Sequence, residues 1–228
     1  MKLLVIEGVD GSGKSTQIKL LNDWFKNKGQ ECKYLHFPRT DSPFFGELIA
    51  RFLRGEFGSL NQVSPWLVAI LYAGDRKDAS GLLNEWLRSG SMVILDRYTF
   101  SNIAYQCAKL NDEKEREELM KWILDLEFRH FGIPVPDLNI FLDVPFAFTE
   151  KKLLLSRTGD DRKYLGGTRD IHEESLLFQK KVREVYLQLA GRDERLQIIN
   201  CSNGQGIMLP PQKISELIID LLTDKKII

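Results

Sequence analysis

The sequence has few cysteines and no excess of either charge. Its three cysteines, Cys32, Cys107 and Cys201, are far apart and show no C-x-x-C spacing, so neither a disulfide framework nor a zinc site is expected. Lysine plus arginine and aspartate plus glutamate both number 32, and a net charge of zero gives no overall field to attract nucleic acid. Any phosphate-binding site must therefore be local.

Long apolar runs are also missing. The N-terminal run ends at Glu7, too early for the apolar part of a signal peptide, and no later segment approaches the ~18 uncharged apolar residues of a membrane span. We expect a cytoplasmic protein that binds neither membrane nor nucleic acid. With 228 residues, a single domain over residues 1–228 is the natural expectation.

Apolar segments alternate with segments of helical periodicity along the chain. Strands that are apolar nearly throughout and alternate with helices are typical of a parallel sheet covered on both faces. We therefore predict an α/β fold with a five-stranded parallel sheet. The expected strands are 2–8, 32–37, 92–96, 138–143 and 196–200, and the expected helices are 14–28, 43–54, 65–89, 100–109, 112–131 and one through 214–221.

One segment differs in composition from the rest. Residues 156–169, with the sequence SRTGDDRKYLGGTR, are polar, rich in glycine and dense in charge. Little apolar material is available there for packing, so we predict a mobile lid. Just beyond it, Asp170 and Glu173 have the spacing of a helix N-cap and its capping-box partner.

The stretch EGVDGSGKST, residues 7–16, follows the first expected strand and precedes a helix. Its glycines, Lys14 and Ser15 satisfy G-x-x-x-x-G-K-[ST], in which backbone N–H groups and a helix N-terminus bind a phosphate chain. Lys14 would reach the β- and γ-phosphates of a nucleoside triphosphate, and Ser15 would hold Mg²⁺. The alternative is a glycine-rich turn capped by Ser12 or Ser15. It is less favoured because the strand before the stretch and the helix after it also match the phosphate-binding motif. The predicted nucleotide-binding residues are Gly8, Gly11, Ser12, Gly13, Lys14, Ser15 and Thr16.

Phosphate binding alone leaves several classes of protein open. A GTPase would carry an N-K-x-D guanine-binding motif, and the related NKGQ at 27–30 lacks the aspartate. A motor acting on nucleic acid would usually have a basic surface. The remaining class is a kinase for a small molecule, with an α/β P-loop kinase fold.

Several further motifs resemble those of thymidylate kinases, which make dTDP from dTMP and ATP. They stand in order and at family-like spacing, and they cover the chain to about residue 190. The motifs are IEGVDGSGKST (6–16), FPR (37–39), YAGDR (72–76), LDRY (95–98), SNIAYQ (101–106) and PDLNIFLDV (136–144).

The resemblance assigns roles to residues around the acceptor nucleotide. Tyr72 and Arg76 share a helix face, and by resemblance they stack on thymine and hydrogen-bond to it; a core tyrosine with a solvated arginine is the alternative. Asn102 would contact the base edge and Tyr105 the sugar. Asp10 would accept from the sugar 3′-hydroxyl, or only brace its loop. Phe37 joins the expected substrate-binding residues.

Other residues are assigned to the phosphates and the metal. Arg39 and Arg97 follow predicted strands, where ligands of parallel sheets bind, and their guanidinium groups suit the acceptor phosphate. Asp96 ends an apolar strand, as a Mg²⁺-binding aspartate would, whereas Asp143 is interpreted as structural. In the family, a catalytic arginine comes from the phosphate loop or from the lid. Position 12 is serine, so we expect lid residues Arg157 and Arg162 to supply it.

The predicted function is therefore Mg²⁺-assisted transfer of a phosphoryl group from ATP to dTMP. A deoxynucleoside kinase is the nearest alternative, but it would need a carboxylate base rather than two arginines beside the acceptor. A catalytically silent nucleotide-binding regulator is the alternative from another class. A homodimer is implied by the resemblance alone, and the apolar region of Trp122 and Phe128 would suit either a dimer or a core.

Overall fold

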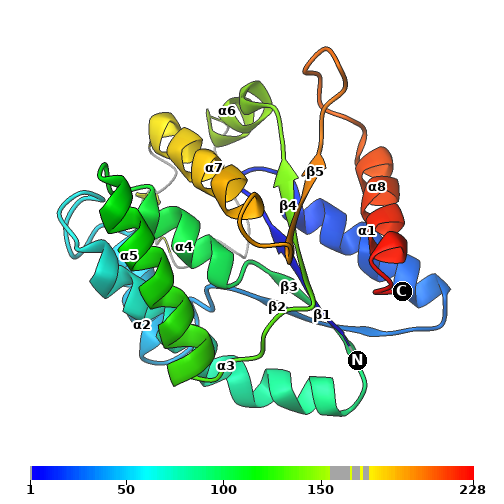
Figure 1. Ribbon diagram of the computed structural model, residues 1–228, viewed down its shortest axis with the longest axis horizontal. Coiled ribbons are helices and arrows are strands. Elements are labelled where there is room, and N and C mark those ends of the chain that lie inside the picture. Colours follow the sequence, from blue (N-terminus) through cyan, green and yellow to red (C-terminus); the bar gives the residue numbers. More distant parts are fainter. Residues whose placement is uncertain (1, 155–164, 166–169, 172–174) are drawn as a thin grey trace.

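The computed structural model describes residues 2–154, 165, 170, 171 and 175–228 (Figure 1). The strands are β1 (Lys2–Glu7), β2 (Cys32–His36), β3 (Met92–Asp96), β4 (Leu138–Asp143) and β5 (Leu196–Asn200). The helices are α1 (Lys14–Asn27), α2 (Phe45–Leu53), α3 (Pro65–Arg88), α4 (Thr99–Cys107), α5 (Glu113–Leu124), the π-helix η1 (Asp125–His130), α6 (Phe146–Leu154), α7 (Leu176–Ala190) and α8 (Pro211–Asp224).

The five strands form one parallel sheet in the order β2-β3-β1-β4-β5. Helices cover both faces, with α1 and α8 together on one side and α3, α4 and α7 on the other (Figure 1). The predicted five-stranded parallel α/β fold is confirmed. Its strand order reverses between β3 and β4, on either side of β1, and ligands of such sheets bind at the carboxyl ends of the strands beside this point.

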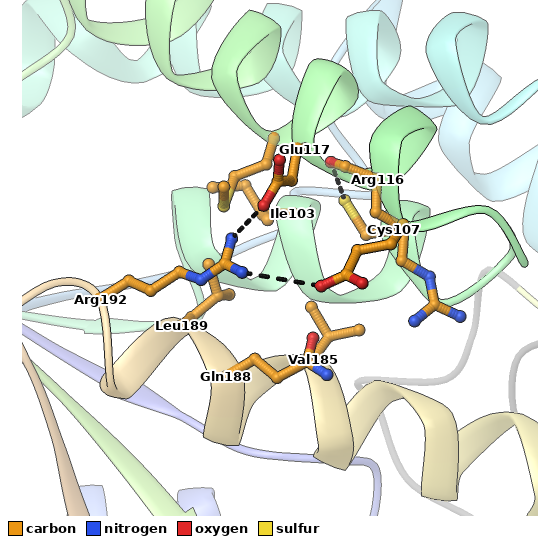
Figure 2. Close-up of a pocket in the computed structure, with 10 residues that line it drawn as sticks. Ile103, Cys107, Arg116, Glu117, Val185, Gln188, Leu189 and Arg192 are labelled. Carbon is orange, nitrogen blue, oxygen red and sulfur yellow. Dashed lines mark hydrogen bonds and ion pairs between the residues drawn. The ribbon is translucent and has the colours of Figure 1, made fainter.

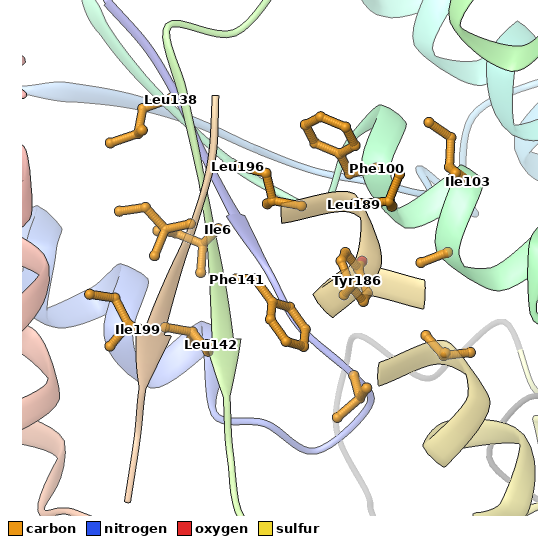
Figure 3. Packing of buried hydrophobic residues seen from close by; sticks show 14 of the residues in the cluster. Ile6, Phe100, Ile103, Leu138, Phe141, Leu142, Tyr186, Leu189, Leu196 and Ile199 are labelled. Carbon is orange, nitrogen blue, oxygen red and sulfur yellow. The ribbon is translucent and has the colours of Figure 1, made fainter. Parts of the chain in front are cut away.

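Alternate residues of the central strands enter the two halves of the core. On β4, Phe141 points towards α7, where its ring stacks on Tyr186 with centroids 4.4 Å apart, while Leu142 points to the opposite side (Figure 3). On β1, Leu4 and Ile6 pack with α1, and Leu3 and Val5 pack with α3. The sheet therefore gives a rigid base, and its carboxyl-end residues are held in fixed positions.

Two local predictions differ from the structure. The expected helix over 112–131 ends its α-helical part at Leu124 and continues as η1, because the apolar periodicity does not distinguish α from π geometry. The capping box at Asp170 is wrong for α7, which begins at Leu176. Its N-cap is Ser175, whose hydroxyl accepts a hydrogen bond from Phe178 N at 3.1 Å.

Part of the sequence interpretation lies outside the described residues. This applies to Glu173 and to the predicted lid over 156–169 apart from Leu165. The lid therefore stays a prediction. Within the described part of the chain, none of the helices combines the length and the apolar character needed to cross a bilayer.

Helix α3 remains continuous across 24 residues despite Gly74 and Gly81. The two glycines have opposite surroundings: a Cβ built on Gly74 would lie 2.3 Å from Phe45 Cε1, whereas a Cβ on Gly81 meets nothing within 4 Å. Gly74 thus permits the close approach of α2 to α3.

We expect Gly74→Ala to destabilise the protein by about 1–3 kcal/mol through overpacking against Phe45. The matched substitution Gly81→Ala should stabilise it by roughly 0.5–1 kcal/mol, because alanine loses less conformational entropy in a helix. Urea unfolding of both variants measures the free energies. Equal effects of the two substitutions would contradict the packing argument.

Candidate active site

The phosphate loop lies between β1 and α1 and is shaped by its glycines. Gly11 and Gly13 have φ values of 77° and 87°, which are left-handed, and Gly13 is the N-cap of α1 with no side-chain cap. The alternative of a serine-capped turn is therefore wrong. A Cβ on Gly8 would lie 2.4 Å from Ser12 Oγ, so the loop closes tightly at Gly8. The start of α1 thus lies at this loop, and the backbone N–H groups and the dipole of a helix N-terminus favour binding of a phosphate.

Lys14 lies over this loop, and its side chain is largely buried. Its Nζ donates to the carbonyl oxygens of Gly8 and Val9 at 3.4 and 3.2 Å. Ser15 and Thr16 follow in the first turn of α1 and are exposed. Ser12 is buried, and its Oγ has no hydrogen-bond partner within the described chain. The residues predicted to bind ATP are thus brought together in the loop and the first turn of α1.

Asp96 ends β3 beside the phosphate loop and is 3% exposed. Burial alone would raise the pKa of Asp96, but the hydrogen bond from His36 and the charge of Lys14 lower it below its usual range. One carboxylate oxygen, Oδ2, lies 3.4 Å from His36 Nδ1. The other, Oδ1, is buried without a hydrogen-bond partner among the described residues, so an ionised oxygen is available there for a cation.

The donor set around Asp96 suits Mg²⁺ better than a transition metal. Among the described residues, no group of three or more His, Cys, Asp or Glu side chains could hold a metal ion. Mg²⁺ is usually bound by one or two protein oxygens together with water and substrate phosphates. Asp96 and the Ser15 hydroxyl are ligands of that kind, and they fit this ion only together with a phosphate chain.

Asp10 connects the phosphate loop to β3 and α4 through a hydrogen-bonded network. Arg97 Nη2 lies 2.6 Å from Asp10 Oδ1, and Oδ2 accepts from the Tyr105 hydroxyl and from Gln179 Nε2, each at 2.8 Å. Arg97 has a left-handed φ of 68°, and its Nη2 also donates to Tyr105 Oη at 3.2 Å. Asp10, Arg97 and Tyr105, predicted separately from three motifs, therefore form one cluster.

Glu7, at the carboxyl end of β1, lies beneath this cluster and was missed by the sequence analysis. Its buried carboxylate accepts from Tyr98 N at 3.0 Å, from the Tyr186 hydroxyl at 2.8 Å and from the Ser101 hydroxyl. Burial raises the pKa of Glu7, partly opposed by these hydrogen bonds. Because Ser101 Oγ also accepts from Arg97 Nη1 at 3.2 Å, Glu7 fixes the turn that carries Arg97.

The residues expected to bind the base lie where α3 meets α4. Tyr72 is half-buried and packs against α2, and burial raises the pKa of its hydroxyl well above the usual value. Arg76 is not solvated but 1% exposed, and it pairs with Glu127 of η1. Asn102 is also buried, with 2% of its surface exposed. Glu127 had no assigned role in the sequence analysis.

Arg39 and Phe37 follow β2. The Arg39 Nε and Nη2 atoms donate to Asp75 Oδ1 and to its carbonyl oxygen, both at 2.8 Å. Phe37 is buried, joined to Pro38 by a cis peptide bond, and packs on Tyr98 with ring centroids 5.7 Å apart. Asp75, another residue that sequence reasoning missed, thus orients the Arg39 guanidinium.

Asp143 ends β4 and has the structural contact expected of it. Its two oxygens accept from Arg183 Nε at 2.5 Å and from Arg183 Nη2 at 2.8 Å. The carboxylate is therefore paired by a cation of α7, unlike Asp96 Oδ1. Arg157 and Arg162, the predicted lid cations, lie outside the described residues.

A separate cavity of about 30 Å³ lies between α4, α5 and α7 (Figure 2). Its rim carries Arg192, which pairs with Glu117 at 3.1 Å, and Cys107, whose thiol donates to Arg116 O at 3.5 Å. Burial raises the pKa of Cys107 to about 12. The cavity has room for about one water, and its thiol is unreactive. None of the predicted site residues lines it, so we assign it no part in nucleotide binding.

Known proteins share this sequence and architecture. The thymidylate kinase family model matches residues 6–208. A protein of Thermococcus onnurineus named "Probable thymidylate kinase" is 38% identical over 202 residues, covering 86% of this chain and 88% of its own. The thymidylate kinase of Mycobacterium tuberculosis is 34% identical over 190 residues, covering 83% and 86%.

The structure of thymidylate kinase from Candida albicans superposes with a TM-score of 0.71 at 25% identity, covering 99% of this chain and 92% of that one. Sequence relatives and a solved structure thus agree with the family match over nearly the whole length. This chain belongs to the thymidylate kinase family.

Proposed function

We propose that this protein transfers the γ-phosphoryl group of ATP to the phosphate of dTMP, giving dTDP and ADP. Family membership supports the reaction. The observation that carries it for this chain is the 2.6 Å contact between Asp10 of the phosphate loop and Arg97 beyond β3. It brings the cation for an acceptor phosphate next to the loop for the donor phosphates.

The reaction joins an oxygen of the dTMP phosphate to the γ-phosphorus of ATP as the bond from that phosphorus to the β–γ bridging oxygen breaks. The electron pair stays with ADP. The acceptor phosphate is already ionised near neutral pH, so no strong general base is needed. Catalysis then rests on positioning and on charge stabilisation.

On the donor side, the backbone of Gly8, Gly11 and Gly13 would bind the phosphate chain of ATP, with Ser12 and Thr16 beside it. Lys14 Nζ would exchange its loop carbonyl partners, at 3.2 and 3.4 Å, for phosphate oxygens. Ser15 and Asp96 would hold Mg²⁺. When bound, that ion neutralises charge on the phosphate oxygens during transfer.

On the acceptor side, we assign the dTMP phosphate to Arg97 and Arg39. Asp10 and Tyr105 would contact the sugar, and the base would lie against Tyr72 and Phe37 with its edge towards Arg76 and Asn102. The support is that Arg97, Asp10 and Tyr105 form one cluster, while Arg76 and Asn102 both bind Glu127.

Further parts of the proposal rest on the sequence and the resemblance. Arg157 and Arg162 stay candidates for the cation at the transferring phosphoryl group, because position 12 is serine. We also propose one domain over 1–228, homodimer formation and a cytoplasmic location. Leu67, 62% exposed on α3 near the Trp66–Trp122 ring contact, is compatible with a dimer interface, and the three free cysteines fit a reducing compartment.

A coupled ADP-release assay with ATP, Mg²⁺ and either dTMP, dUMP, dCMP or thymidine tests the function. We expect dTMP to give the highest kcat/KM and thymidine to give no product, because Arg39 and Arg97 suit an acceptor that already carries phosphate. Phosphorylation of thymidine in preference to dTMP would instead support a deoxynucleoside kinase. ADP release independent of any acceptor would refute both.

A further inference from the structure

Glu127 is a fully enclosed carboxylate beside the proposed base site. It is 0% exposed and lies in the π-helix η1. Four donors approach it: Arg76 Nε and Nη2, both at 2.6 Å, the Thr99 hydroxyl at 2.8 Å and Asn102 Nδ2 at 3.0 Å. A carboxylate offers about four acceptor positions, so these contacts fill it and fix its orientation.

The contacts of Asn102 determine which way its amide faces. Its Nδ2 donates to Glu127 Oε1 at 3.0 Å and to Ala69 O at 3.1 Å. Both neighbours are acceptors only, so the reversed amide would place Oδ1 against two oxygens. Oδ1 is itself buried and has no hydrogen-bond partner in the described part of the chain. Asn102 Oδ1 is therefore an unpaired hydrogen-bond acceptor, and leaving such an acceptor buried costs free energy.

We propose that Glu127 is a positioning residue that locks the Asn102 amide, so that the enzyme accepts pyrimidines with an N3–H donor and rejects cytosine. The inference rests on the proposed function, since it requires the base at Asn102. Thymine and uracil both carry N3–H, which can donate to Asn102 Oδ1. Cytosine carries an acceptor at N3, which would face a second acceptor. A site built to bind an N–H strongly rejects an analogue that lacks it.

The negative charge is needed for this lock. A neutral glutamine at position 127 would bring an N–H of its own that could face Asn102, so that the amide could turn and offer Nδ2–H to cytosine N3. Glu127 also neutralises the buried Arg76, so its removal affects folding as well. The test therefore measures substrate preference. Loss of a purely structural role would lower activity on all substrates and would not favour the cytosine substrate over dTMP.

The experiment compares kcat/KM for dTMP, dUMP and 5-methyl-dCMP, which keeps the methyl group of dTMP and changes only the edge of the base. Glu127→Gln and Glu127→Asp are compared with the wild type. Aspartate keeps the charge for Arg76 but is one methylene shorter, so it withdraws from Asn102. We expect the dTMP to 5-methyl-dCMP ratio to fall about tenfold or more in both variants.

Two controls isolate the lock. The dTMP to dUMP ratio should stay unchanged in the same variants, because thymine and uracil present the same N3–H. Thr99→Val removes a different hydrogen bond to Glu127 and should leave the dTMP to 5-methyl-dCMP ratio as in the wild type. A ratio that stays at the wild-type value in folded Glu127→Asp, or that falls as far in Thr99→Val, would overturn the proposal.

Failure of the proposed function is distinguishable, because it would appear as a wild-type enzyme without activity on dTMP. If neither variant at position 127 folds, NMR of the Asn102 side-chain amide in the wild-type protein tests the proposal. Two separate, exchange-protected Nδ2 protons that persist when dTMP is added support the lock. Averaged or rapidly exchanging protons overturn it.

Discussion

Replacing Arg97 with alanine is expected to reduce phosphoryl transfer to dTMP by roughly 10²–10³-fold or more, with the fold intact. The guanidinium lies 2.6 Å from Asp10 and is anchored by Ser101, so it is held ready for the acceptor phosphate at no further ordering cost. We expect the KM for dTMP to rise and kcat to fall together, because the same cation would bind the acceptor and offset repulsion from the donor. A coupled ADP-release assay measures both.

Glycine at the same position separates activity from stability. Arg97 has a φ of 68°, a conformation that costs a non-glycine residue about 1–2 kcal/mol and glycine almost nothing. Arg97→Gly should therefore be inactive like Arg97→Ala but more stable by about 1 kcal/mol in urea unfolding. Near-normal turnover of either variant would rule out the role of Arg97, and an alanine variant as stable as the glycine variant would rule out the strain.

The parts of the molecule that could be predicted from sequence are those set by neighbouring residues. The bounds of β3, β4 and β5 agree with the prediction because their apolar runs end sharply in polar residues. The phosphate loop was predictable because its glycines and lysine act through the backbone between a strand and a helix. The start of α3 at Pro65 follows from the fixed φ of proline.

The contacts of charged residues could not be predicted in this way. Arg76 was singled out by its motif, but its partner Glu127 lies 51 residues away and is brought to it by η1. The sequence around Glu127 reads as an ordinary amphipathic helix, so nothing local marks it as buried. Glu7 stands at the end of a continuous apolar strand, and a carboxylate in that place is a weak sign of a particular role. The sequence analysis interpreted Glu7 only as part of the phosphate-loop motif.

Glu7 and Glu127 have a common arrangement. Each is a fully buried carboxylate with no role assigned to it in the reaction, and each accepts several hydrogen bonds from α4 or the turn before it. One holds the turn that carries Arg97, and the other holds Asn102. Buried charges are costly unless paired in this way. The position of α4 relative to β1 and η1 is therefore set by the same contacts that order the proposed acceptor site.

Replacing Lys14 with methionine is expected to reduce turnover by about 10²–10³-fold or more, because one positive charge on the donor phosphates is lost. Methionine keeps the length and the apolar stem of the side chain but loses the hydrogen bonds from the lysine Nζ to two loop carbonyls at 3.2 and 3.4 Å, so the melting temperature of the variant is measured beside its turnover to confirm that it is folded. Lys19→Met, an exposed substitution of the same kind on α1, should retain wild-type turnover. Lys14→Met with a rate within tenfold of the wild type would mean that the phosphate loop holds ATP without the lysine, and the donor side of the proposed mechanism would be wrong.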